Sequence, residues 1–497
     1  MKSSILLGVL VAFRVVSVFF IRTWFVPDEI FQSVEVAHRI VFNSGHLSWE
    51  WRYGLRSVLH PYFIAFGYMI LKLLSLDTVD TVIYLPRLMH AVVFGISDYF
   101  YYQLSKRLLT AVGARFALFS YLTSWFVWYC ATRTLSNSLE TALMLIALNW
   151  YPLHITANGS KSMRSYLPYL LIAFLSIFIR PTAVLIWFPL GLWHLCRCKT
   201  PLQLLLYSLF VAFLPLFLLV VVMDSLFYGH ITVTLWNFAS FNVFEGGSEN
   251  FGTNPFYWYF SEGLFSVLTV HTFPVILGIL LALVKRKVSF MPLLVALFYV
   301  LFHSFLAHKE HRFLLPVIPF LCLYSGYFFS SLSRHFSMSK LFLCFTLITV
   351  NLSLASYFGL YHQSGPNAVN NFIVANATNL SSKNFTVVQL MPCYSMPYYS
   401  YLHGFQVTVH SLDCTPNFYH ITGSVDEADR FYENPQSFLL NNQLLANATY
   451  VVVFSDMYKT LAPMLENENF KLCGRFFHAH FLTSERQSSH IHVACKS

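Results

Sequence analysis

Long apolar runs with few charges are the feature that most limits what this chain can fold into. A run of about 20 apolar residues crosses the hydrocarbon core of a bilayer as a helix, and such runs recur from Ile5 to Leu360. Of the 497 residues, 56% are hydrophobic and only 11% are charged, against roughly 25% charged residues in an ordinary soluble domain. The sequence therefore predicts an α-helical polytopic membrane protein.

The loops between these runs predict the orientation of the chain. Every second loop carries clustered Lys and Arg, and such loops stay in the cytosol. The loops between them should be luminal, and residues 228–262 contain three Glu and no Lys or Arg. By parity, only one of the two runs between 57 and 104 crosses fully, and which one is left open. About eleven transmembrane helices are expected, from apolar runs at 5–25, 57–75, 82–104, 111–131, 137–153, 166–182, 184–197, 204–227, 264–284, 289–307, 313–331 and 340–360.

Two further features of composition concern the first run and the net charge. The run at 5–25 contains Arg14 and lacks a small-residue cleavage site, so it is expected to be a retained helix and not a cleaved signal peptide. The formal net charge is +9, but the cations lie in short clusters between apolar runs. No nucleic-acid partner is therefore expected.

The chain changes character at about residue 361. The tail has no Trp and gains β-rich stretches at Phe385–Leu390, Val407–His410 and Tyr450–Phe454. It is predicted to be a small luminal α/β domain, residues 361–497. Residues 1–360 are predicted to be the transmembrane module, with luminal loops at 26–56 and 228–262.

Cysteines and sequons in the tail fit an oxidising lumen. Four cysteines, at positions 393, 414, 473 and 495, allow three disulfide pairings, and the pairing stays open. Glycosylation sequons begin at Asn376, Asn379, Asn384 and Asn447, which are expected to carry glycans. A further sequon at Asn158 lies on the predicted cytosolic side and should stay unmodified.

Charged residues gather on the predicted luminal side. Two carboxylates, Asp28 and Glu29, follow Pro27 directly after the first run. Adjacent carboxylates at a membrane surface are commonly only solvated charge, but other polar segments are expected on the same side. These contribute Arg133, Asn137, Glu140, Arg180, His308, Lys309, Glu310 and Arg312.

Cations on the luminal side need a reason, because the positive-inside bias depletes them there. Arg offers a fork to phosphate and Lys a compact charge, so Arg133, Arg180, Lys309 and Arg312 suit a phosphate at the membrane boundary. The structural alternative is a set of salt bridges with Glu140 and Glu310. A carboxylate beside such a phosphate could take the proton of an attacking sugar hydroxyl, which describes an inverting transferase with a phospholipid donor.

Asp28 is expected to be the general base, with Glu29 as the second choice. His308 and Glu310 would orient the cations or contact sugar hydroxyls. His308 and His311 do not fit the H-E-x-x-H pattern of a zinc site, and the cations can balance a leaving phosphate. Neither a metal nor another cofactor is expected.

These motifs resemble, in order and spacing, the multispanning family 22 glycosyltransferases of the GT-C architecture. The shared segments are Pro27-Asp28-Glu29, Thr132–Asn137 with Glu140, Arg180-Pro181-Thr182 and His308–Phe313. Segments of the tail are similar to those of the family branch that adds the third mannose to glycosylphosphatidylinositol (GPI) precursors: Met391–Ser395, Pro397–Ser400, Asp426–Asp429, Phe431-Tyr432, Phe476–His478 and Ser489–Ile491. One departure is Val26, where the family usually has a histidine before Pro-Asp-Glu.

The resemblance implies a GT-C fold and an enzyme of the endoplasmic-reticulum membrane with a luminal active site. The donor would be dolichyl-phosphate mannose, the acceptor a GPI precursor lipid with two mannoses, and the new bond α-1,2. Relatives that add the fourth GPI mannose, or that build the N-glycan precursor, share the membrane motifs. A transporter of lipid-linked substrates and a structural subunit of a membrane complex are the competing classes.

Overall fold

The computed structural model describes residues 3–153, 162–247, 252–332, 337–378, 384–417 and 425–497. They form two compact units. The first comprises residues 1–18, 50–62 and 87–355, and the second comprises 19–49, 63–86 and 356–497. Each unit is described by itself.

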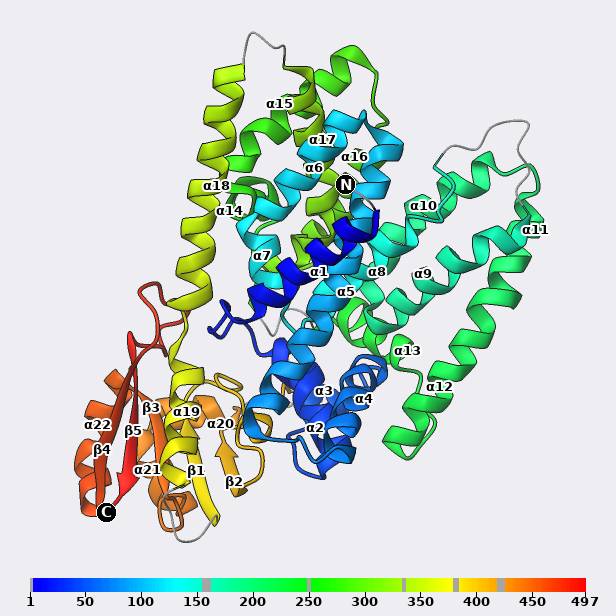
Figure 1. The fold of residues 1–497 in the computed structure, drawn as a ribbon. Coiled ribbons are helices and arrows are strands. Elements are labelled where there is room, and N and C mark those ends of the chain that lie inside the picture. Colours follow the sequence, from blue (N-terminus) through cyan, green and yellow to red (C-terminus); the bar gives the residue numbers. More distant parts are fainter. Residues whose placement is uncertain (1–2, 154–161, 248–251, 333–336, 379–383, 418–424) are drawn as a thin grey trace. The chain divides into compact units, whose positions relative to one another are not determined.

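The first unit is built of helices (Figure 1). Four helices, α3 (Trp49–Arg52), α4 (Leu59–Leu73), α5 (Val79–Leu108) and α18 (Ser337–Leu360), have residues in both units. The remaining α-helices of this unit are α1 (Ser3–Val18), α6 (Ala111–Thr123), α7 (Trp125–Ala131), α8 (Ser136–Ala147), α9 (Leu167–Ile179), α10 (Val184–Arg197), α11 (Pro201–Tyr207), α12 (Leu214–Tyr228), α13 (Thr234–Ala239), α14 (Leu264–Leu268), α15 (Thr272–Lys285), α16 (Met291–Phe305) and α17 (Ile318–Ser331).

Within the described residues, 5 helices are long and apolar enough to cross a membrane. They span Val79–Leu108, Pro201–Tyr228, Tyr259–Lys285, His311–Ser331 and Met338–Leu360. Shorter apolar helices lie at Ser3–Val18, Leu59–Leu73, Met163–Ile179 and Met291–Phe305. The polytopic helical fold is thus confirmed, whereas the number of about eleven crossings stays a prediction. Of the two runs between 57 and 104, only the second forms one of the long spans.

A buried ion pair explains the arginine inside the first apolar run. Arg14 Nε donates to Asp98 Oδ2 at 2.7 Å, and both side chains are fully buried. Because an uncompensated charge in an apolar surround is costly, Asp98 on α5 allows Arg14 to lie in α1. The same helices approach closely at Gly95, where an added Cβ would stand 2.6 Å from Val11 Cα.

The second unit contains a five-stranded mixed sheet (Figure 1). The strand order is β2-β1-β3-β5-β4. Strand β1 (Asn384–Leu390) pairs in parallel with β2 (Gln406–Ser411) and β3 (Tyr450–Phe454). The antiparallel strand β5 (His490–Lys496) lies between β3 and β4 (Phe470–Phe477). The three β-rich stretches predicted from the sequence are therefore confirmed as strands.

Helices cover both faces of this sheet. Successive residues of a strand point to opposite faces, so each strand contributes side chains to both helix layers. Val451 and Val453 belong to a core cluster that also contains side chains of α20 (Glu427–Glu433), α21 (Pro435–Asn442) and α22 (Ser455–Asn467). Tyr450 and Val452 belong to a second cluster, with side chains of α19 (Gly365–Ala377). The tail is thus a small α/β domain, as predicted.

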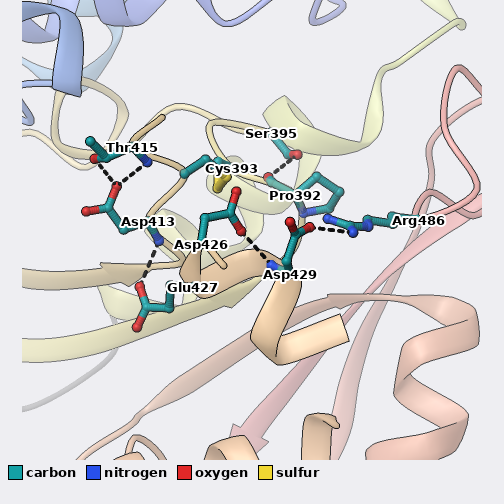
Figure 2. The surroundings of a disulfide bond; sticks show 10 residues. Pro392, Cys393, Ser395, Asp413, Thr415, Asp426, Glu427, Asp429 and Arg486 are labelled. Carbon is teal, nitrogen blue, oxygen red and sulfur yellow. Dashed lines mark hydrogen bonds and ion pairs between the residues drawn. A yellow bond between two sulfur atoms is a disulfide. The ribbon is translucent and has the colours of Figure 1, made fainter. Parts of the chain in front are cut away.

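Two disulfides select one of the three possible pairings in the tail. They join Cys393 to Cys414 and Cys473 to Cys495. The first ties the segment after β1 to the segment after β2, beside the hydrogen-bonded residues Asp413 and Asp426 shown in Figure 2. The second joins β4 to β5 across the sheet.

Candidate active site

Asp28 and Glu29 begin a continuous helical stretch of the second unit. The stretch goes on through a π-helical segment, η1 (Ile30–Val34), into α2 (Glu35–Phe42). The Pro27 carbonyl accepts hydrogen bonds from the backbone N–H groups of Ile30 and Phe31 at 3.1 and 3.0 Å. Carboxylates in a first helical turn are favoured by the helix dipole. The Asp28 side chain is half-buried, whereas Glu29 is buried.

The candidate cations belong to the first unit, and Arg133 is the most deeply buried of them. It lies in the turn between α7 and α8, where its Nε donates to the Tyr129 carbonyl at 3.1 Å. Its guanidinium stands 4.1 Å from the centre of the Tyr129 ring, a distance at which a cation is attracted to an aromatic face. Asn137 is buried in the first turn of α8.

Glu140 and Arg180 form a buried ion pair. Arg180 follows the last residue of α9, and its Nε lies 3.1 Å from Glu140 Oε2 on α8. A second guanidinium nitrogen donates to Ser136 Oγ at 3.2 Å. Arg180 therefore holds the start of α8 against the end of α9.

The His308–Phe313 segment contains a compact charged cluster. Arg312 donates to both Glu310 oxygens, at 2.7 Å from Nε and 2.6 Å from Nη2. His308 Nε2 lies 2.9 Å from Glu310 Oε1. Burial alone would raise the pKa of Glu310, but the Arg312 guanidinium and the His308 ring hold it below its usual range.

Lys309, the next residue along this segment, points to backbone oxygens. Its Nζ donates to the carbonyls of Leu306 and Asn254 at 2.6 and 2.8 Å. Burial lowers the pKa of the Lys309 amine, since it disfavours the charged form. The two hydrogen bonds nevertheless hold the amine in place.

The Phe313 ring brings the two ion pairs together. The guanidinium carbons of Arg180 and Arg312 stand 5.1 and 5.3 Å from its centre. The His308 ring lies 6.1 Å from the same point. Five of the predicted residues, Glu140, Arg180, His308, Glu310 and Arg312, thus form one group in the first unit. We call this group the Phe313 cluster.

The comparison with protein families agrees with this set of motifs. The Alg9-like mannosyltransferase family matches residues 5–403. The chain belongs to this family. The match covers the Asp28-Glu29 turn, the Phe313 cluster and the beginning of the tail.

Curated members of this family are similar to nearly the whole chain. GPI alpha-1,2-mannosyltransferase 3 of Bos taurus is 39% identical over 493 residues, which cover 97% of this chain and 87% of that protein. The human protein of the same name is also 39% identical, over 97% of this chain and 85% of that protein. GPI mannosyltransferase 3 of Candida albicans is 30% identical over 98% of this chain and 96% of that protein.

Solved structures share the fold of this mannosyltransferase. ArnT from Cupriavidus metallidurans, crystallised with undecaprenyl phosphate, gives a TM-score of 0.62 at 16% identity, over 99% of this chain and 97% of that chain. The Archaeoglobus fulgidus oligosaccharyltransferase gives 0.53 at 13% identity, over 96% and 73%. These similarities confirm the GT-C fold.

The predicted site residues of this mannosyltransferase fall into both units. Asp28 and Glu29 lie in the second unit, and the eight residues expected to bind substrate lie in the first. Both salt bridges named as the structural alternative, Arg180 with Glu140 and Arg312 with Glu310, are present. Among the described residues, no group of three or more His, Cys, Asp or Glu could hold a metal ion.

Sequence reasoning missed two residues. Phe313 was only the last letter of a motif, although its ring contacts both arginines. Glu35 was not among the predicted site residues, yet it is fully buried. A carboxylate inside an otherwise amphipathic helix was the signal available, because a charge rarely becomes buried without partners.

Proposed function

We propose that this chain transfers mannose from dolichyl-phosphate mannose to a GPI precursor that already carries two mannoses. The product would contain a third mannose in α-1,2 linkage, made at the luminal face of the endoplasmic-reticulum membrane. The observation that carries this proposal is similarity to GPI alpha-1,2-mannosyltransferase 3 of Bos taurus over 97% of this chain. That similarity includes the tail, which lies largely beyond the family match at 5–403.

In this proposal Asp28 accepts the proton of the acceptor hydroxyl. The freed oxygen attacks the anomeric carbon of mannose while the bond to the donor phosphate breaks, and the phosphate leaves with the electron pair. Attack from the opposite face inverts the configuration. The half-buried position of Asp28 supports it as the base, since a base must reach the hydroxyl that it deprotonates. Glu29 is buried and remains the second choice.

Arg133, Arg180, Lys309 and Arg312 are proposed to bind the donor phosphate. Two of them are paired with Glu140 and Glu310. Preorganised cations stabilise the charge that develops on a leaving phosphate. His308, Glu310, Glu140 and Asn137 would orient these cations or contact sugar hydroxyls, and no metal would be required.

The test is transfer by the purified protein in liposomes. Labelled dolichyl-phosphate mannose is supplied with one of three acceptors: a dimannosyl GPI lipid, a trimannosyl GPI lipid or an N-glycan precursor. Label in the dimannosyl GPI lipid alone, unaffected by a chelator, is the expected result. Label in another acceptor would assign a different family activity. Movement of the labelled lipid between leaflets without transfer would indicate a transporter.

A further inference from the structure

Glu35 is a carboxylate buried where the proposed function gives it no role. It follows Asp28 by seven residues in the same helical stretch, and its side chain is fully buried. Oε1 accepts hydrogen bonds from Ser400 N at 2.9 Å and from Ser400 Oγ at 2.7 Å. Oε2 accepts from the backbone N–H of His46 at 3.0 Å. The Glu35 side chain therefore links the helix that begins at Asp28 to the backbone at His46 and to Ser400 in the tail.

Two further side chains on the same side of this helix, Phe31 and His38, contact the tail. Phe31 packs against Tyr394 and Tyr398, with ring centres 4.8 and 4.7 Å apart. His38 Nε2 lies 2.8 Å from His403 Nδ1. Residues 31, 35 and 38 recur at the spacing of one helical face, so this whole face lies against residues 394–403 of the tail.

The tail segment that receives the helix is itself fixed. Its start is tied by the disulfide between Cys393 and Cys414, and Ser395 Oγ donates to the Pro392 carbonyl (Figure 2). Asn370 on α19 donates to the Pro397 carbonyl at 3.0 Å. The helix that begins at Asp28 therefore packs against a tail segment that is held by a disulfide and by hydrogen bonds.

We infer that the tail domain positions the base, and that Glu35 is the positioning residue through which it does so. This inference rests on the proposed role of Asp28. Three hydrogen bonds to one buried carboxylate set the rotation and height of the helix. Small displacements of a reacting group can cost about a hundredfold in rate, so loosening these bonds should slow the chemical step without changing substrate affinity.

The test compares Glu35→Gln with a matched control, Glu427→Gln. Glu427 Oε2 accepts a hydrogen bond from the Asp413 backbone N–H at 2.8 Å in the tail domain (Figure 2), so it is likewise a carboxylate bound to a backbone N–H. For Glu35→Gln, kcat should fall roughly tenfold or more with KM unchanged for both substrates. Hydrogen exchange should rise in residues 28–42 and 394–403 together. Glu427→Gln should change neither kcat nor that exchange.

Two results would overturn the inference. One is a normal kcat in a folded Glu35→Gln protein, and the other is an equal fall of kcat in both Glu→Gln variants, which would mean general destabilisation. If Glu35→Gln does not fold, Ser400→Ala removes only one of the three bonds and should still lower kcat several-fold. Asp28→Asn is assayed in parallel, so that failure of this inference can be told from failure of the proposed function. An active Asp28→Asn protein would remove the assignment of Asp28 as the base.

A separate observation concerns the connection between β4 and β5. Phe481 is 69% exposed and Leu482 is 46% exposed. The connection is fastened to the end of α18: Tyr357 Oη lies 2.8 Å from His480 Nδ1, and the Tyr357 and Phe481 ring centres are 6.4 Å apart. The polar end of the connection turns to the tail domain, where Arg486 donates to Asp429 at 2.6 Å (Figure 2).

We propose that Phe481 and Leu482 insert into the bilayer at the surface where α18 ends. Met338–Leu360 is one of the long apolar spans, so its last turn lies at the edge of the hydrocarbon core. Aromatic and apolar side chains beside such an end are stabilised at the interface, which accounts for two large apolar groups left exposed to water otherwise. Lipid, and not a protein partner, is the occupant that this position favours.

The test replaces Phe481 with the photoreactive analogue p-benzoylphenylalanine in the full-length protein. A matched control places the same group at Leu440, which is 67% exposed on α21, far from the last turn of α18 in Figure 1. After irradiation in phosphatidylcholine nanodiscs, mass spectrometry should find lipid adducts at position 481 and none at 440. No lipid adduct at 481, equal adducts at both, or an adduct at 481 with protein only would overturn the proposal.

Discussion

Asp28 and Glu29 are neighbours in the chain but differ in their surroundings. The backbone N–H of Glu29 donates to the Val26 carbonyl, and the Glu29 carbonyl accepts from Ser33 Oγ. The Glu29 side chain is buried, whereas that of Asp28 is half-buried. A buried carboxylate serves packing and hydrogen bonding, while an accessible one can meet a substrate hydroxyl. This difference supports the proposal that Asp28 accepts the proton.

Asp28→Asn should therefore lower mannose transfer by roughly a hundredfold or more. The amide keeps the shape of the side chain but cannot accept the proton. Transfer is measured with labelled donor, and folding by thermal unfolding. Glu29→Gln is the paired variant and should be the less damaged of the two. Full turnover by a folded Asp28→Asn protein would contradict the assignment.

Arg312→Ala should impair use of the donor more than use of the acceptor. A charge-assisted hydrogen bond to phosphate is worth about 1.5–3 kcal/mol, which corresponds to roughly a tenfold to hundredfold loss. Steady-state kinetics with each substrate varied in turn gives the comparison. Arg486→Ala is the control, because Arg486 is exposed and pairs with Asp429 in the tail. Equal losses for donor and acceptor would indicate that Arg312 supports the fold through Glu310.

Secondary structure was most predictable where one short pattern determines it. Short β-rich stretches located β1, β2 and β3, and the apolar run at 82–104 became α5. The π-helical turn at Ile30–Val34 was not predicted, because it depends on local hydrogen bonding that no periodicity reveals. The disulfide pairing also stayed open, since it is decided by strand order. Strand β5 lies beside β4 and places Cys495 opposite Lys471, close to Cys473.

The stability of the protein is expected to depend on pH, because His38 is buried where the helix packs against the tail. Burial, with a smaller contribution from His403, lowers the pKa of His38 to about 4, although the Ser44 carbonyl acts in the opposite direction. An unfolded histidine titrates near 6.5, so between these values the folded state binds fewer protons than the unfolded state. The contribution of His38 to the free energy of unfolding is therefore unaffected above about pH 6.5. As the pH falls toward 4, the free energy of unfolding decreases by on the order of 2 kcal/mol.

Thermal unfolding between pH 7 and pH 4 measures this effect. His38→Gln should flatten the dependence in that window. His490→Gln is a control in the same unit, because His490 is the first residue of β5 and is not part of the helix face. An unchanged pH dependence in His38→Gln would contradict the assignment to His38.

For the whole molecule, the sequence was enough to recognise the family, but it did not show which chain segments make up each of the two units. The first loop, residues 19–49, belongs to the same unit as the tail. Glu35 and Ser400 are 365 positions apart, and no local sequence pattern in either segment predicts their contact. Contacts of this kind depend on the assembled fold. The position of Phe313 between Arg180 and Arg312 was hidden for the same reason.

The proposed reaction requires the Asp28 turn, the Phe313 cluster and the tail on one side of the membrane, and sequons can report which side. Asn384 and Asn447 are exposed and Asn376 is half-buried, while Asn379 and Asn158 lie outside the described residues. Because the Lys- and Arg-rich loops predict a luminal tail, at least one of the four tail sequons should carry a glycan. Asn158 should carry none. Glycosidase sensitivity of single Asn→Gln variants reads this out. A glycan at Asn158 and none in the tail would place Asp28 in the cytosol, where a luminal mannosyltransferase could not use it.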